Sequence, residues 1–319
     1  MSARELVVLG TASQVPTVAR NHNGYLVRWD GAGVLVDPGE GTQRQMLRAG
    51  VSGAEIDRIC LTHLHGDHCL GLPGVLDRRL LDGATAPASL HFPAASADAL
   101  ERLRGASNPH AAALAVPAPV DVGPVPAPLG EVDGVAPLPG GARLLAAALE
   151  HRVPAVGYRI QEPDGVSLLP DALAARGVWG PDVGRLVRDG TLEAASGRVT
   201  LAEVSVPRRG QSLAVVMDTR VCEGAVELAR DVDVLVIEAT FLDADAELAA
   251  AYAHLTAREA GRIAAQAGAR SLVLTHFSRR YGDSGEPFAV EAAAEFGGPV
   301  HAAEDLDVVP LPPRRVKPA

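Results

Sequence analysis

The sequence has little of what marks several protein classes. It has only three cysteines, and they form no CxxC pair, so we expect reduced thiols rather than a disulfide framework. Aromatic residues make up 3% of the chain, which argues against stacking platforms for single-stranded nucleic acid. No apolar run approaches the roughly 18 residues of a membrane span. Gly10 and Pro16 interrupt the first apolar run before it reaches the length of a secretory signal. These absences predict a soluble cytoplasmic protein with no membrane partner.

Positive charge is also scarce. Lysine and arginine number 29 against 39 aspartates and glutamates, which gives a formal net charge of −10. Taken alone, this balance disfavours a nucleic-acid partner, because phosphate binding usually leaves a basic footprint. The hydrophobic fraction of 47% and the charged fraction of 21% are those of a globular protein, and they exclude disorder, collagen and coiled coil.

Short apolar runs that end in a polar residue recur along the chain. They occupy residues 33–36 before Asp37, 59–62 before His63, 213–217 before Asp218, 234–237 before Glu238, and 271–275 before His276. Such runs are typical of strands buried on both faces, and helical patterns lie between them at residues 224–230 and 257–267. The alternation predicts a layered α/β fold, in which ligands collect beyond the carboxyl ends of strands.

Two segments differ from the rest of the chain in composition and periodicity. Residues 105–142 are rich in Ala, Pro and Val without a clean period, and they predict loops with edge elements. Residues 163–206 carry turn signals and a short amphipathic pattern around residues 183–187. Because this second segment interrupts the succession of strands and ligand-type residues, we interpret it as an insertion.

The strongest local signal is the segment Thr-His-Leu-His-Gly-Asp-His at residues 62–68. Imidazole and carboxylate groups suit Zn²⁺, and Gly66 allows the tight turn that would bring them together. This segment offers four candidate metal ligands, and three more at later strand ends raise the number of candidates to seven. The seven are His63, His65, Asp67, His68, His151, Asp218 and His276. Seven ligands are too many for one tetrahedral zinc, but they suit two metals that share a bridging carboxylate.

With these motifs, the chain resembles the ribonuclease Z family of the metallo-β-lactamase superfamily. The HxHxDH motif followed by a distant His, Asp and His is the superfamily pattern. The segments at residues 37–43, 238–241 and 274–278 are more specific to the family. The resemblance covers nearly the whole chain and implies a four-layer αββα fold. It also implies a catalytic body at 1–162 and 207–319, with an inserted tRNA-binding exosite arm at 163–206. Met217 and Ile237 depart from the family, which often has Gly and His at these positions.

The resemblance further implies a role for each candidate. One zinc would be held by His63, His65 and His151, a second by Asp67, His68 and His276, and Asp218 would bridge them. Asp67 would orient or deprotonate the attacking water, and His254 would protonate the leaving 3′ oxygen. Glu238 could fix the tautomer of His254. Arg258 lies four residues after His254, so the two side chains could share one face. A structural ion pair is the alternative for both Glu238 and Arg258.

Candidate RNA contacts are weaker. Gly180 and Pro181 resemble the Gly-Pro motif of the family's arm, Arg208 and Arg209 follow the insertion, and Arg280 lies four residues beyond His276. Residues 159–209 carry as many acids as arginines, so a solvated arm is the alternative. We expect Asp37 to brace the metal loop through hydrogen bonds. The remaining histidines are interpreted as structural: His22, His91, His110 and His301.

The leading hypothesis is a homodimeric, zinc-dependent endoribonuclease that cuts precursor tRNA after the discriminator base. Its products would be a tRNA 3′-hydroxyl and a 5′-phosphorylated trailer. A small-molecule phosphodiesterase or arylsulfatase of the same superfamily is one alternative, and it would not need the segment 163–206. A catalytically silent RNA-binding protein is another, and the retention of all seven ligand candidates together with His254 disfavours it.

Overall fold

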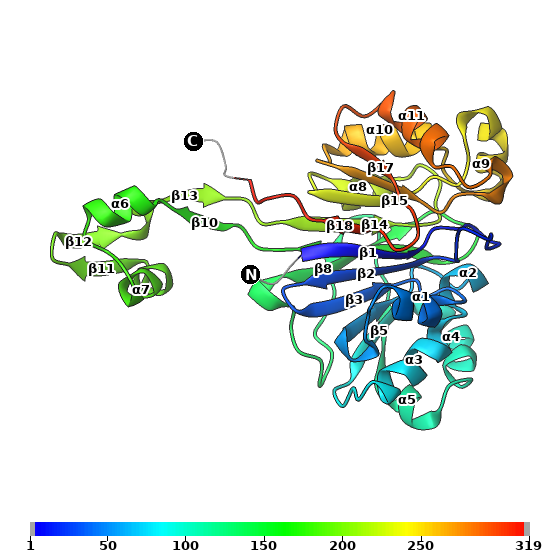
Figure 1. The fold of residues 1–319 in the computed structure, drawn as a ribbon, viewed down its shortest axis with the longest axis horizontal. Coiled ribbons are helices and arrows are strands. Elements are labelled where there is room, and N and C mark those ends of the chain that lie inside the picture. The colour runs from blue at the N-terminus through cyan, green and yellow to red at the C-terminus, as the bar shows by residue number, and fades with distance from the viewer. Residues whose placement is uncertain (1–3, 316–319) are drawn as a thin grey trace. The chain divides into compact units, whose positions relative to one another are not determined.

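The computed structural model describes residues 4–315, which divide into two compact units (Figure 1). The first unit comprises the chain up to Gln161 together with Ser212–Pro312. The second comprises Glu162–Gln211 and residues 313–315. The segment 163–206 lies inside the second unit, and the sequence did not predict that residues 313–315 belong to it. No helix among the described residues has the length and apolarity needed to cross a membrane.

Two mixed sheets of seven strands each build the first unit. In order across the first sheet these are β18 (Val308–Pro310), β1 (Arg4–Gly10), β2 (Gly24–Trp29), β3 (Ala32–Val36), β4 (Ile56–Cys60), β5 (Ala88–Pro93) and β6 (Ala115–Val120). The second sheet holds β17 (Val300–Ala302), β16 (Leu272–Thr275), β15 (Val234–Glu238), β14 (Ser212–Val216), β9 (Ala155–Gln161), β8 (Arg143–Leu149) and β7 (Ala127–Pro128). Neighbouring strands are parallel from β3 to β6 and from β14 to β17.

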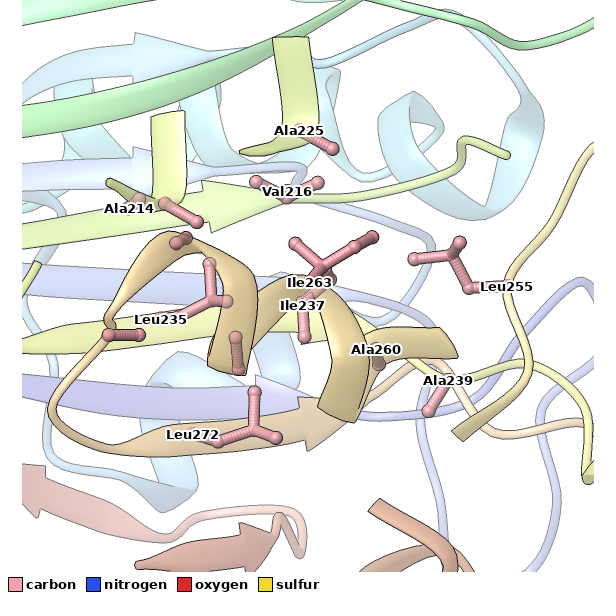
Figure 2. Close-up of a cluster of buried hydrophobic side chains, with 14 of the residues drawn as sticks. Ala214, Val216, Ala225, Leu235, Ile237, Ala239, Leu255, Ala260, Ile263 and Leu272 are labelled. Atoms are coloured by element: carbon pink, nitrogen blue, oxygen red, sulfur yellow. The ribbon is translucent and has the colours of Figure 1, made fainter. Parts of the chain in front are cut away.

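Helices cover the outer face of each sheet, so the first unit has the predicted four-layer αββα fold (Figure 1). The first sheet carries α1 (Thr42–Arg48), α3 (Leu72–Leu81), α4 (Ala97–Arg104) and α5 (Pro109–Ala113), and the second carries α8 (Glu223–Ala229), α10 (Ala257–Ala267) and α11 (Glu286–Ala293). Figure 2 shows Ile263 of α10 over Ile237 of β15 and Val216 of β14. Alternate residues of the strands, such as Val215, face the other sheet instead.

The predicted apolar runs are strands β3, β4, β14, β15 and β16, with shifted ends. Strand β4 stops at Cys60, before the predicted end at residue 62, because the Thr62 N–H and hydroxyl donate to Asp37 and its carbonyl accepts from Val156 of the other sheet. Helix α10 has the predicted bounds, and Gly268 at φ 68° caps its carboxyl end. Strands β6 and β7 of the segment 105–142 lie at sheet edges, as expected.

The second unit has a small core of its own. Two antiparallel pairs form it, β10 (Gly165–Leu168) with β13 (Ser205–Arg208) and β11 (Thr191–Ala194) with β12 (Gly197–Thr200), together with helices α6 (Pro170–Ala175) and α7 (Pro181–Asp189). Its buried side chains are Leu173, Val178, Leu186, Val199 and Val204. Gly180 precedes α7 at φ 57°, and Pro181 occupies the first helical position, where no backbone N–H is required.

Candidate metal centre and active site

The loops that follow four strands bring the ligand candidates together. The segment from His63 to His68 follows β4, and its short helix α2 (Gly66–Cys69) begins directly after His65. His151 follows β8, Asp218 follows β14, and His276 follows β16. The candidate ligand atoms converge in two sets, one of His63, His65, His151 and Asp218, and one of Asp67, His68 and His276. All seven predicted candidates therefore meet at one end of the sandwich.

Asp218 belongs to the first set and also faces the second. One of its carboxylate oxygens is directed at the histidines of each set. Oδ2 is 3.5 Å from Nε2 of His63 and 3.7 Å from Nε2 of His151. Oδ1 is 3.3 Å from Nε2 of His68 and 3.2 Å from Nε2 of His276. Asp218 is buried, and Oδ1 accepts no hydrogen bond from the described residues. Because a buried carboxylate oxygen without a partner is costly, a cation on each side of Asp218 fits this arrangement.

The imidazole nitrogens also point at one another. Nδ1 of His65 is 2.9 Å from Nε2 of His63 and 3.3 Å from Nε2 of His151. A neutral imidazole has one N–H, so three converging ring nitrogens cannot satisfy one another fully, whereas a shared cation satisfies them all. Burial is the main cause that lowers the pKa of each of these three histidines. They are thereby held in the neutral form that binds metal.

The ring nitrogen that faces away from the centre is anchored in four of the histidines. The pairs are His63 Nδ1 with Thr62 Oγ1 (3.1 Å), His68 Nδ1 with Asp37 Oδ2 (2.9 Å), His151 Nδ1 with the Ala253 carbonyl (2.9 Å) and His276 Nδ1 with Thr240 Oγ1 (2.7 Å). Such contacts fix ring orientation and tautomer, so the second nitrogen of each ring is aimed at the centre before any metal arrives.

Asp37 braces the metal loop, as the sequence predicted. Its side chain is fully buried, and its oxygens accept hydrogen bonds from Thr62 N at 2.7 Å and from Thr62 Oγ1 at 2.6 Å, besides facing His68. The residue has φ 48°, a left-handed conformation that Asp and Asn tolerate better than most residues.

We expect Asp37→Asn to weaken metal binding by about 10–100-fold while the chain stays folded. Asparagine fits the same space and backbone, but its amide group has only one oxygen. It therefore cannot accept hydrogen bonds at both positions that the Asp37 carboxylate uses. Competition with a chromogenic chelator measures the affinity. Asp57→Asn is the matched control, since the Asp57 carboxylate accepts from Gly33 N outside the centre. Equal affinities in the two variants would contradict the bracing role.

His254 lies beside the ligand sets and is held by a buried glutamate. It follows α9 (Ala246–Tyr252) and Ala253, and its Nδ1 is 3.0 Å from Glu238 Oε1. Its Nε2 lies 3.9 Å from Asp218 Oδ2. Burial lowers the pKa of His254, but the Glu238 and Asp218 carboxylates outweigh burial and raise it to about 9. The expected contact between Glu238 and His254 is therefore present, and the catalytic role of the pair stays a prediction.

Thr240 is a site residue that sequence reasoning missed. Its hydroxyl lies 2.5 Å from Glu238 Oε2 and 2.7 Å from Nδ1 of His276, so it links the glutamate to a ligand candidate. Its place in the segment 238–241, directly after β15, was the only available signal.

The expectation that Arg258 shares a face with His254 is wrong. His254 precedes α10, whereas Arg258 lies inside it. The Arg258 guanidinium forms ion pairs at 3.0 Å with Asp243 and with Glu295, and Arg258 is not among the described residues that line the cavity over the centre. The structural ion pair, which the sequence left open, describes this residue.

A cavity of about 620 Å³ opens over the ligand sets. Arg280 lines it, and so do Arg152 and Arg279, which the sequence did not single out. Contact of Arg280 with RNA stays a prediction. His22, for which the sequence predicts only a structural role, also lines the cavity, with Nε2 3.2 Å from the Gln14 carbonyl. No motif marks these residues, because only the folded loops decide which side chains reach the cavity.

The other predicted RNA contacts belong to the second unit. Gly180 and Pro181 begin α7, Arg208 is 3.6 Å from Glu162, and the backbone N–H of Arg209 donates to the Arg315 carbonyl. These contacts lie within the unit and say nothing about RNA, so all four residues stay predictions.

Comparison with known proteins gives a consistent picture. Residues 17–160 match the model of the metallo-beta-lactamase superfamily, and residues 186–277 match that of a beta-lactamase superfamily domain. Ribonuclease Z of Nocardia farcinica is 54% identical over 99% of this chain and 100% of its own length. Ribonuclease Z of Kineococcus radiotolerans is 56% identical over 100% of this chain and 99% of its own length.

Solved structures resemble the chain in fold. Human tRNase Z, short form, has a TM-score of 0.65 at 24% identity and covers 97% of this chain and 99% of its own. The metallo-beta-lactamase fold protein YhfI from Bacillus subtilis has a TM-score of 0.68 at 18% identity. The match covers 97% of this chain and 100% of the YhfI chain. At these identities, the likeness concerns the fold alone.

Proposed function

The chain belongs to the ribonuclease Z family, and from this membership we propose that it is a zinc-dependent endoribonuclease that removes 3′ trailers from precursor tRNA. Cleavage leaves a tRNA 3′-hydroxyl and a 5′-phosphorylated trailer. The observation that carries the proposal is the pair of ligand sets on the two oxygens of Asp218, with His254 beside them. The family resemblance also supports a cytoplasmic homodimer, whose mass light scattering would test.

The donor sets suit two zinc ions. His63, His65 and His151 would hold one, Asp67, His68 and His276 the other, and Asp218 both. When bound, two Zn²⁺ ions would neutralise charge on the scissile phosphate and lower the pKa of a nearby water. They would formally change the net charge from −10 to −6. The acidic composition is therefore compatible with an RNA substrate.

Asp67 is the residue suited to handle the attacking water. Burial raises the pKa of its carboxyl group, but the neighbouring His68 and His276 outweigh burial and lower the pKa below its ordinary value. Its Oδ2 accepts a hydrogen bond from Gln14 N at 2.7 Å, which fixes the carboxylate at the cavity wall. An ionised, oriented carboxylate can accept a hydrogen bond from water and receive its proton.

His254 is the residue suited to protonate the leaving oxygen. Glu238 stabilises the imidazolium form and fixes the Nδ1 hydrogen, so Nε2 carries the proton that faces the cavity. A ribose 3′ oxygen is a poor leaving group unless it is protonated as the P–O bond breaks. Arg152, Arg279 and Arg280 line the same cavity, where guanidinium groups can contact flanking phosphates.

The role of the second unit as a tRNA-binding arm can be tested by shortening it. Leu168 of β10 pairs with Ser205 of β13, so residues 169–204 can be replaced by a two-residue turn while the hairpin is kept. We expect kcat/KM for precursor tRNA to fall at least about tenfold, which corresponds to about 1.4 kcal/mol of lost binding. Hydrolysis of a chromogenic phosphodiester should stay at the native rate.

The same two substrates distinguish the alternatives. Undiminished precursor cleavage by the shortened chain would contradict the exosite arm. A native chain that hydrolyses only the small ester would be a small-molecule phosphodiesterase. A native, metal-loaded chain that binds tRNA and cleaves neither substrate would be the silent RNA-binding protein.

A further inference from the structure

A second cavity, of about 290 Å³, lies in the first unit away from the metal centre. Residues at the start of β8, Arg143 and Leu144, line it, whereas the end of β8 leads to His151 of the centre. The two cavities share no lining residue. Strands β4 and β5 contribute its polar wall, and the chain between residues 128 and 138 contributes much of the rest. The proposed RNA cleavage assigns it no role.

Arg58 in β4 places a buried positive charge at this cavity. The residue is 8% exposed and donates a hydrogen bond to the Ala136 carbonyl, and within residues 4–315 no aspartate or glutamate forms an ion pair with it. The carboxylate of its neighbour Asp57 accepts from Gly33 N instead. Asp57 favours the charged form of Arg58 only from a distance, and a buried guanidinium without an ion-pair partner is costly, so an anion is the expected partner.

Arg79 shows what a purely structural buried arginine looks like in this fold. It is 2% exposed, and its guanidinium donates to three backbone carbonyls, those of Ile56, Ala86 and Leu114. Arg58 has one such bond and lines an open cavity. The difference points to a partner for Arg58 that is not a part of the described chain.

Two further groups in β5 lie beside Arg58. Ser89 pairs with Arg58 and His91 pairs with Cys60 across the parallel strands, and residues two apart in a strand share a face. Ser89 is 1% exposed, and its hydroxyl has no hydrogen-bond partner among the described residues. Burial, with Arg58 as the second cause, lowers the pKa of His91 to about 4, so its neutral ring has one N–H to donate. The sequence predicts only a structural role for His91.

The remaining wall is mostly apolar. Leu129, Val135, Leu138 and Leu144 contribute to it, and Glu131, the one acid among the lining residues, is exposed. We propose that this cavity binds a small organic anion, with its oxyanion head on Arg58, Ser89 and His91 and its apolar body against Leu138 and Leu144. The head is a carboxylate or a phosphate, since both accept from a guanidinium and a hydroxyl.

Crystals of the metal-loaded protein soaked in 4-bromobenzoate or in 4-bromophenyl phosphate test the proposal directly. The bromine's anomalous signal locates the body of each probe, and the two probes distinguish the two heads. We expect at least one probe in this cavity, with its head within hydrogen-bond distance of Arg58 and Ser89. Signal only over the metal centre, or in neither place, would overturn the proposal.

Calorimetric titration of the better probe gives the second test. Ser89→Ala removes an unpaired hydroxyl, so we expect an intact fold, native phosphodiester hydrolysis and a Kd raised about tenfold. Asp67→Ala should leave this Kd unchanged, because Asp67 lies at the other cavity. An unchanged Kd in Ser89→Ala would contradict the assigned head contacts.

Thermal unfolding distinguishes a ligand-binding arginine from a structural one. Arg58→Met removes a buried charge that has no ion-pair partner, so the ligand-free melting temperature should be unchanged or higher, and the probe should no longer raise it. Arg79→Met, the matched control, should melt clearly lower because three carbonyls lose their donor. A similar loss in both variants would show that Arg58 is structural and overturn the proposal.

Discussion

Asp218→Ala is expected to lower precursor cleavage by about 10³-fold or more and to reduce the metal content of the purified chain. The two oxygens of Asp218 face different ligand sets, at 3.2–3.7 Å from four imidazole nitrogens, so one substitution removes a ligand from both. Bound metals contribute several kcal/mol of charge stabilisation in the transition state, and each 1.36 kcal/mol corresponds to a factor of ten in rate.

Asp218→Asn makes the experiment sharper. The amide keeps one oxygen, so one ligand set retains its carbonyl-type donor while the other faces an NH₂ group. We expect a metal content between those of the native chain and Asp218→Ala. Atomic emission on dialysed protein measures zinc per chain, and circular dichroism checks the fold. Native metal content together with native cleavage in Asp218→Ala would contradict the two-metal assignment.

His254→Ala is expected to lower kcat for precursor tRNA by about 10²–10⁴-fold, the usual contribution of a positioned general acid. Metal ligation is the competing role, because His254, Asp218 and His276 also bring ligand atoms within 4.8 Å of one another. The leaving group separates the two roles. Nitrophenolate departs without a proton, so a proton donor is dispensable for a nitrophenyl phosphodiester, whereas a metal ligand is needed for both substrates.

We therefore expect His254→Ala to hydrolyse the nitrophenyl ester at close to the native rate and to keep its zinc. Equal losses on both substrates, with zinc lost, would assign His254 to metal binding instead. Glu238→Gln should show a smaller loss with the same substrate dependence, since the amide can still contact the ring but stabilises the imidazolium less. Arg258→Ala is the control, because its ion pairs with Asp243 and Glu295 are screened by solvent and lie outside the cavity.

Much of the centre could be predicted because its signals are local in the chain. Apolar strands that end at ligand-type residues depend on neighbours in sequence, and so do the bounds of α10 with its Gly268 cap. In place of the predicted tight turn, Gly66 begins the short helix α2. The pairing of Glu238 with His254 could be inferred because each is adjacent to a regular element whose direction the pattern gives.

The Arg258 prediction was wrong for a related reason. Spacing along the chain does not say which side chains from other segments reach a residue, and Asp243 and Glu295 engage the Arg258 guanidinium. The positions of Arg152, Arg279 and His22 at the cavity depend on loops that have no period to follow.

By itself, the sequence predicted the layered α/β class, the seven ligand candidates and the contact between Glu238 and His254. These predictions were possible because strand and ligand signals act over a few residues. Only the tertiary structure decided that the two oxygens of Asp218 face separate ligand sets, and that Thr240 joins His276 to Glu238. It alone revealed Arg58, Ser89 and His91 around a second cavity. Burial and the absence of a partner are properties of contacts between distant segments, and a linear pattern does not contain them.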